Sequence, residues 1–194
     1  MTSHSSTPLR TLTLVLGGAR SGKSSYAQRQ VERRGNGQEL LYVATAEAQD
    51  EEMLSRIQRH RSERSEIWRT LEEPLDLASA LPPVAPVAGI VLIDCITLLV
   101  SNLLLKLEAE LPVEEIEKQI LAEIEKILAV YRSGTASWWL VSNEVGLGIV
   151  PAYPLGRSYR DALGRVNARL AAEADQVIFM VAGLPLAVKG VLPA

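Results

Sequence analysis

The chain has 194 residues, of which 47% are hydrophobic and 22% charged, and its formal net charge is -3 at pH 7. This length is suited to one domain with a sizeable core, and the composition excludes a disordered chain. The acidic balance excludes the global basic field of proteins that bind nucleic acids or acidic membranes.

The amino-terminal stretch and the cysteine content bear on location. Residues 1–10, MTSHSSTPLR, contain no apolar segment typical of a secretory signal, and no apolar run is long enough to span a bilayer. The single cysteine, Cys95, cannot form an internal disulfide, which is typical of a reducing compartment. We expect a cytoplasmic protein in which residues 1–8 form a flexible tail and residues 9–194 form one domain.

The first predicted strand, residues 11–16, runs directly into a glycine-rich loop. The loop reads GGARSGKS and matches the phosphate-loop pattern G-x-x-x-x-G-K-[ST]. Its glycines let backbone N–H groups wrap around phosphates, Lys23 places a positive charge at the β- and γ-phosphates, and Ser24 offers a hydroxyl to Mg²⁺. We therefore expect a nucleoside triphosphate site. Its loop residues are Gly17, Gly18, Ala19, Arg20, Ser21, Gly22, Lys23 and Ser24.

Strands and helices alternate along the rest of the chain. Further strands are predicted at residues 39–45, 89–94, 137–141 and 176–181, and helices at 24–34, 50–64, 75–81 and 158–174. Residues 98–107 have helical spacing, and a long amphipathic helix runs from Pro112 to a cap at Ser133-Gly134. Because the strands are apolar throughout, they indicate a mostly parallel central sheet with helices on both faces. The predicted fold is therefore an α/β P-loop NTPase of the RecA-like type, with its site beyond the carboxyl ends of the strands.

Asp94 ends the apolar run GIVLID. A carboxylate at the end of a buried strand downstream of a phosphate loop is typical of an Mg²⁺ ligand, which would lie beside Ser24. The alternative is an aspartate that only caps the next turn. We interpret Asp94 as functional because the phosphate loop precedes it.

The helix after the second strand contains the chain's second histidine. Glu52, Arg56, His60 and Arg64 recur every fourth residue, so they share one face of the helix. Neighbouring arginines favour the neutral form of a histidine, which suits a nucleophile, and could hold the phosphates of a nucleotide. A solvated helix stabilised by a Glu52–Arg56 pair explains the same pattern. The residues alone leave both interpretations open.

Other polar stretches are less specific. In the loop SNEVGLGIVP, Asn143 and Glu144 follow a strand directly, but an ordinary surface turn would have the same sequence pattern. We interpret the last helix as an exposed or interface helix, and Trp138 and Trp139 as core residues. The polar residues on that helix are Arg157, Arg160, Asp161, Arg165, Asn167 and Arg169.

Several blocks in this order resemble one family. They are GGARSGKSSYAQ, LYVATAEAQDEEMLSRIQRHRSER, VLIDCITLLVSNLL, VSNEVGLGIVP and GRVNARLAAEADQVIFMVAGLPLAVK, and together they cover most of the chain. They are similar to the bifunctional adenosylcobinamide kinase/adenosylcobinamide-phosphate guanylyltransferases of cobalamin biosynthesis.

The resemblance implies two reactions. ATP or GTP phosphorylates the aminopropanol hydroxyl of adenosylcobinamide; GTP then guanylylates a histidine, and the cobinamide phosphate takes up the GMP to give adenosyl-GDP-cobinamide. By resemblance the histidine is His60, with Lys23 and Asp94 also catalytic and Mg²⁺ on Ser24 and Asp94. The nucleotide contacts that the resemblance adds to the phosphate loop are Ala44, Thr45, Ala46, Arg61, Ser62, Glu63, Arg64, Glu72 and Asp94.

The resemblance also suggests a homo-oligomer, the family being known as a trimer with sites between subunits. Where many members have two adjacent histidines, this chain has Arg59 before His60, so a role for the first position is in doubt. Other functions compatible with the residues are a P-loop kinase for a different small alcohol and a RecA-like nucleotide-switched oligomer. A GTPase switch is disfavoured because no N-K-x-D-type motif is present.

Overall fold

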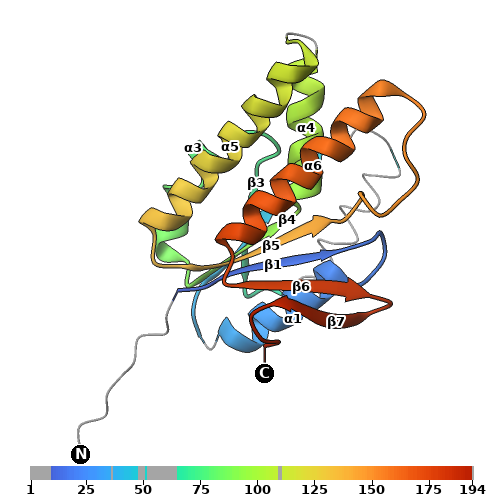
Figure 1. Ribbon diagram of the computed structural model, residues 1–194. Coiled ribbons are helices and arrows are strands. Elements are labelled where there is room, and N and C mark those ends of the chain that lie inside the picture. Colours follow the sequence, from blue (N-terminus) through green and yellow to red (C-terminus); the bar gives the residue numbers. More distant parts are fainter. Residues whose placement is uncertain (1–9, 36, 48–50, 52–64, 109–110, 194) are drawn as a thin grey trace, which may run out of the picture.

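A single mixed sheet runs through the computed structural model, which describes residues 10–35, 37–47, 51, 65–108 and 111–193 (Figure 1). Its strands are β1 (Leu12–Gly17), β2 (Leu40–Ala44), β3 (Trp68–Glu72), β4 (Ile90–Asp94), β5 (Ser137–Asn143), β6 (Gln176–Val181) and β7 (Leu184–Lys189). They lie in the order β3-β2-β4-β5-β1-β6-β7. All pairs are parallel except β6 with β7, which is antiparallel.

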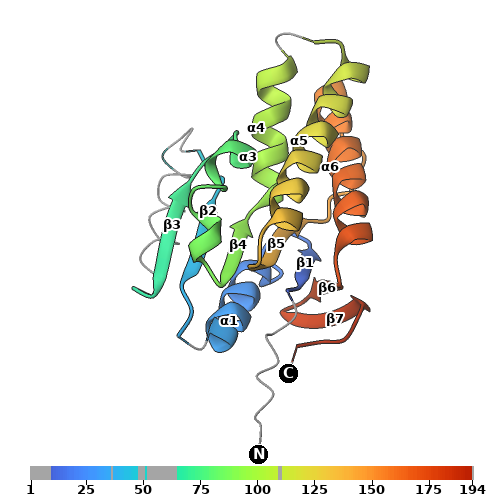
Figure 2. The same cartoon turned by 90° about the vertical axis from the view of Figure 1, so that its left-hand side faces the viewer.

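Helices cover both faces of the sheet, as the apolar strands predict. They are α1 (Lys23–Gly35), α3 (Leu77–Ala80), α4 (Ile96–Glu108), α5 (Val113–Ser133) and α6 (Pro154–Glu173), with the short 3-10 turn η1 (Ala85–Val87). Figures 1 and 2 show α4, α5 and α6 side by side on one face and α1 on the other. None of the helices in the described residues is both long and apolar enough to cross a membrane.

The core consists of two clusters, one on each face of the sheet. Trp138 packs into the cluster under α4, α5 and α6, and Trp139, the next residue on β5, packs into the cluster under α1. Both tryptophans are fully buried, so their interpretation as core residues is confirmed. The α5 stripe is confirmed as well, since Ile116, Ile120 and Ile124 are buried in the first cluster.

Ion pairs join α5 to α6 across their exposed edges. Arg169 pairs with Glu125 on α5, and Arg132 of α5 donates to both carboxylate oxygens of Glu173 at 2.8 Å. Arg165 pairs with Glu117 at 2.5 Å. Two of the arginines predicted to decorate the last helix therefore bind the neighbouring helix of the same chain.

The structure corrects several predicted boundaries. Strands β3 and β7 were not predicted from the sequence, and α6 begins at Pro154 rather than residue 158, because proline suits the first turn of a helix. Helix α4 begins at Ile96, and α3 spans only Leu77–Ala80. The predicted tail at residues 1–8 lies outside the described residues.

Candidate active site

Strand ends bring the predicted site residues to one edge of the sheet. Ala44, at the end of β2, is in register with Glu72 of β3 on one side and with Asp94 of β4 on the other. Beyond β4 and β5, Gly17 at the end of β1 is in register with Asn143. The structure thus aligns the phosphate loop with three candidate residues that lie far apart in the sequence.

The phosphate loop has the backbone bends that its motif predicts. Gly17 and Gly22 have φ values of 152° and 90°, a region that glycine enters at little cost. Between them, Arg20 also has a positive φ, of 56°. Ser21 donates from its backbone N–H to the carbonyl of Gly18 at 3.3 Å. Helix α1 then begins at Lys23, so its positive end faces the loop. The loop can therefore present backbone N–H groups to an anion.

Lys23 lies within this loop. Its side chain is buried and its Nζ donates to the carbonyl of Gly18 at 2.6 Å. Burial lowers the pKa of the Lys23 ammonium from its usual value, while Cys95 and the Asp94 carboxylate act in the opposite direction. A phosphate oxygen could replace the carbonyl of Gly18 as the partner of this ammonium, which would supply the negative charge that a buried cation needs.

Asp94 ends β4, which is separated from β1 and its phosphate loop by one strand, β5. The Tyr42 hydroxyl donates to Asp94 Oδ2 at 2.9 Å. In the described part of the chain, no three His, Cys, Asp or Glu side chains are grouped as in an all-protein metal cage. One carboxylate with the Ser24 hydroxyl is an oxygen donor set that fits Mg²⁺, which usually keeps waters and binds substrate phosphates.

Buried polar side chains near this edge were not predicted. Thr97, Ser142 and Asn167 are buried where α4, β5 and α6 meet. The Asn167 amide donates to the carbonyl of Asn143 at 3.0 Å, and the backbone N–H of Asn143 donates to Thr97 Oγ1 at 2.6 Å. These contacts fix the end of β5 beside the phosphate loop. They also correct the assignment of Asn167 to an exposed helix surface.

Thr45 and Asn102 form a second buried polar group, at the ends of β2 and β4. Thr45 Oγ1 donates to the carbonyl of Cys95 at 2.7 Å and accepts from its backbone N–H at 2.9 Å. Asn102 was missed in the sequence, although a polar residue inside the apolar run of α4 is a signal that could have indicated it. His60, Arg61, Ser62, Glu63 and Arg64 lie outside the described residues, while Ala46 is described and half-buried.

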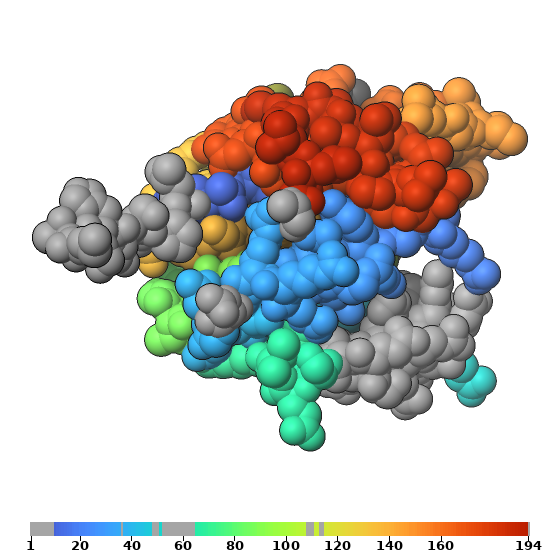
Figure 3. Space-filling view, turned by 90° about the horizontal axis from the view of Figure 1, so that it is seen from below, coloured from blue at the N-terminus to red at the C-terminus, as the bar shows by residue number. Residues whose placement is uncertain are grey.

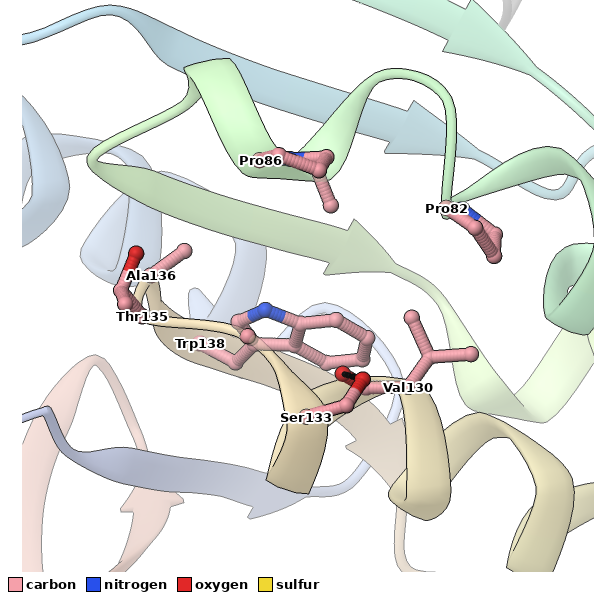
Figure 4. Close-up of a pocket in the computed structure, with 9 residues that line it drawn as sticks. Pro82, Pro86, Val130, Ser133, Thr135, Ala136 and Trp138 are labelled. Carbon is pink, nitrogen blue, oxygen red and sulfur yellow. Dashed lines mark hydrogen bonds between the residues drawn. The ribbon is translucent and has the colours of Figure 1, made fainter.

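A cavity of about 220 Å³ lies at the other end of β5, among Pro82, Pro86, Val130 and Trp138 (Figure 4). Trp138 is in register with Leu12, at the start of β1, whereas the phosphate loop follows the end of β1. None of the candidate site residues lines this cavity. It is therefore separate from the candidate active site.

Comparison with known proteins gives close relatives over nearly the whole chain. The family model CobU, described as cobinamide kinase / cobinamide phosphate guanyltransferase, matches residues 13–188. A "Bifunctional adenosylcobalamin biosynthesis protein CobU" from Escherichia coli is 39% identical over 183 residues, which are 92% of this chain and 99% of that protein. A "Bifunctional adenosylcobalamin biosynthesis protein CobP" from Pseudomonas aeruginosa is 42% identical over 177 residues, 91% of this chain and 96% of that protein.

Among solved structures, the flagellar accessory protein FlaH from Methanocaldococcus jannaschii is similar, with a TM-score of 0.53 and 14% identity. The match covers 93% of this chain and 78% of that chain. At this identity the likeness bears on the fold alone. Together with the phosphate loop after β1, it confirms the α/β P-loop NTPase fold of the RecA-like type that the sequence predicts.

Proposed function

Because this chain belongs to the CobU family of cobinamide kinases/cobinamide phosphate guanyltransferases, we propose that it catalyses both reactions. ATP or GTP phosphorylates the aminopropanol hydroxyl of adenosylcobinamide, and GTP then supplies GMP to the product, giving adenosyl-GDP-cobinamide. The observation that supports this most is the alignment of Glu72, Ala44 and Asp94 with the phosphate loop on one sheet edge.

In the proposed kinase step the phosphate loop holds the β- and γ-phosphates. The substrate hydroxyl oxygen attacks the γ-phosphorus and its proton is lost to solvent, while the bond to the bridging oxygen breaks and the nucleoside diphosphate leaves. Lys23 and the backbone N–H groups of the loop stabilise the charge on the phosphate oxygens in the transition state. The support for this role is the burial of Lys23 inside the loop at the start of α1.

In the proposed guanylyl transfer the neutral imidazole of His60 attacks the α-phosphorus of GTP, and pyrophosphate leaves. An oxygen of the cobinamide phosphate then attacks the same phosphorus and displaces His60, so one difficult transfer becomes two easier ones. Arg61 and Arg64 would neutralise phosphate charge. The support is that the chain leaves β2 toward His60 at the edge that holds the phosphate loop.

Mg²⁺ is the metal that this oxygen donor set fits, with Ser24 and Asp94 as the residues that would hold it. When bound, it would reduce the negative charge on the phosphate oxygens. The Asp94 carboxylate is held in place by the Tyr42 hydroxyl, which supports a fixed position for a ligand.

We also propose that the chain forms a homo-oligomer, with a trimer as the form suggested by the family. Strand β7 and the residues around it expose large apolar side chains beside α1, where the C-terminal hairpin lies in Figure 3. Exposed apolar patches of this kind are typical of subunit contacts. The side chains are Val181, Leu184, Leu186, Val188, Val191 and Leu192.

The test is to incubate the protein with adenosylcobinamide, Mg²⁺ and ATP, then add GTP, and identify the corrinoid products by mass spectrometry. We expect the phosphate ester first and the GDP-linked corrinoid after GTP. Lys23→Met should form neither product, while Lys126→Met, a change at an exposed lysine of α5, should form both. A kinase for another alcohol, or a nucleotide-switched oligomer, would give no GDP-linked corrinoid.

A further inference from the structure

We propose that Asn102 is a positioning residue for guanylyl transfer. Its amide binds the backbone just beyond the ends of β2 and β3, and the chain continues from the end of β2 toward His60. This inference rests on the proposed function, and it adds a residue outside the phosphate loop that acts on one of the two reactions.

Both hydrogen bonds of the Asn102 amide go to backbone carbonyls in different loops. Nδ2 donates to the carbonyl of Thr45 at 3.0 Å and to the carbonyl of Pro74 at 3.1 Å. Thr45 follows β2 directly, and Pro74 lies two residues beyond the end of β3. One amide on α4 therefore ties together two neighbouring loops at the site edge.

Thr45 is held from a second direction by Cys95. Its hydroxyl exchanges two hydrogen bonds with the backbone of Cys95, the residue after Asp94. The backbone N–H of Glu73 also donates to the carbonyl of Ala44 at 3.0 Å, which extends the pairing of β2 with β3. Asn102 thus completes a frame that joins the ends of β2, β3 and β4.

Core packing alone does not explain an asparagine at this position. Asn102 is 8% exposed, and both Leu99, one turn before it on α4, and Leu103, the next residue, are buried apolar residues. A buried amide costs free energy unless it is hydrogen-bonded, so a leucine would suit the core better if no carbonyls needed a donor. The amide is accounted for by the two loop carbonyls that it binds.

The frame includes the end of β2, from which the chain continues toward His60. The contacts of Asn102 are to loops at β2 and β3, whereas the phosphate loop follows β1, on the other side of β4 and β5. The hydrogen bonds between Thr45 Oγ1 and the backbone of Cys95 do not involve the Asn102 amide, so we expect them, and with them the position of Asp94, to persist when Asn102 is changed. Loss of the amide should therefore displace the carbonyl of Thr45 and the residues after it, which continue toward His60, and leave the kinase site largely in place.

The experiment compares Asn102→Leu with Asn167→Leu. Asn167 is a matched control because it is also a buried helical asparagine whose Nδ2 donates to a loop-end carbonyl, that of Asn143 at the end of β5. For each purified protein we would measure the rate of labelling by α-labelled GTP with Mg²⁺, the rate of adenosylcobinamide phosphorylation by ATP, and the melting temperature.

For Asn102→Leu we expect labelling to slow by about 10- to 100-fold, the effect of misplacing a reacting group by roughly 1 Å, and phosphorylation to stay within about threefold of wild type. Asn167→Leu should not show this selective loss. Equal loss of both activities in Asn102→Leu, or labelling at the wild-type rate, would overturn the inference.

Asn102→Gln provides a second variant should Asn102→Leu not fold, since it keeps the amide but moves it by one methylene; the same selective loss is expected. The inference and the proposed function fail differently. If the wild-type protein takes up no label, the guanylyl-histidine step itself is refuted, and the inference is refuted with it. If the wild-type protein is labelled and the Asn102 variants are labelled at the same rate, only the inference is refuted.

Discussion

Gly17, the first residue of the phosphate loop, should not tolerate a side chain. Its φ of 152° is unfavourable for any other residue, and a Cβ built there would lie 2.6 Å from the carbonyl oxygen of Met180 and 2.8 Å from Ser21 Oγ. Met180 is the residue of β6 in register with Gly17, so the closer contact is to sheet backbone, which cannot move aside easily. Gly17→Ala must therefore distort either the loop or the sheet.

The cost follows from these two effects. Holding an alanine in a sparsely populated backbone region costs about 1–3 kcal/mol, and forcing a methyl group into a filled space costs about 1–3 kcal/mol. Partial relaxation makes their sum an upper bound, so we expect a loss of roughly 2–5 kcal/mol. For a chain of this size that lowers the melting temperature by about 4–20 °C.

Two glycines serve as controls in the same melting assay, read by circular dichroism. No heavy atom lies within 4 Å of a Cβ added at Gly18 or at Gly164 of α6, and neither has a positive φ. Gly164→Ala should be neutral or stabilising by up to about 1 kcal/mol. Gly18→Ala should keep its stability, which separates an effect on nucleotide binding from one on folding. A Gly17→Ala protein as stable as wild type would refute the steric argument.

Three further predictions concern stability and assembly. Arg132 hydrogen-bonds to Glu173 and holds the pKa of that carboxyl at about 2, below its usual value. The ionised Glu173 carboxylate therefore stabilises the fold fully above pH 5, and this stabilisation is lost as the pH falls toward 2. Glu173→Gln should accordingly lower the melting temperature at pH 7 but not at pH 2. Trp68→Phe removes the 2.8 Å bond from Nε1 to Glu32 and should cost about 1 kcal/mol by urea unfolding. Leu186→Lys, on exposed β7, should lower the molar mass by light scattering; an unchanged mass argues against this contact surface.

Most of the fold was predictable because its strands are buried and apolar. The strands β1, β2, β4, β5 and β6 were predicted within two residues of their observed ends. Strand β3 was missed because it is a sheet edge with exposed Arg69 and Glu72, so its sequence WRTLE has no continuous apolar pattern. Strand β7 was missed because it pairs antiparallel after the last predicted element and contains Pro185.

The candidate site was predictable where a local motif exists. The phosphate loop and Asp94 are recognisable from the residues around them, and the structure places both at one sheet edge. Asn102 and its carbonyl partner Thr45 are 57 residues apart, and Tyr42 is 52 residues from Asp94. Contacts at such separations depend on the order of strands in the sheet, which local spacing does not contain.

The most direct test of the account is labelling with α-labelled and, separately, γ-labelled GTP in the presence of Mg²⁺, on wild type and His60→Ala. The account predicts label from the α position only, labile to acid and stable to alkali, and absent in His60→Ala. Label from the γ position would indicate a phosphoenzyme instead. A protein that binds GTP but retains no label from either position would contradict the guanylyl-histidine step and leave a P-loop kinase.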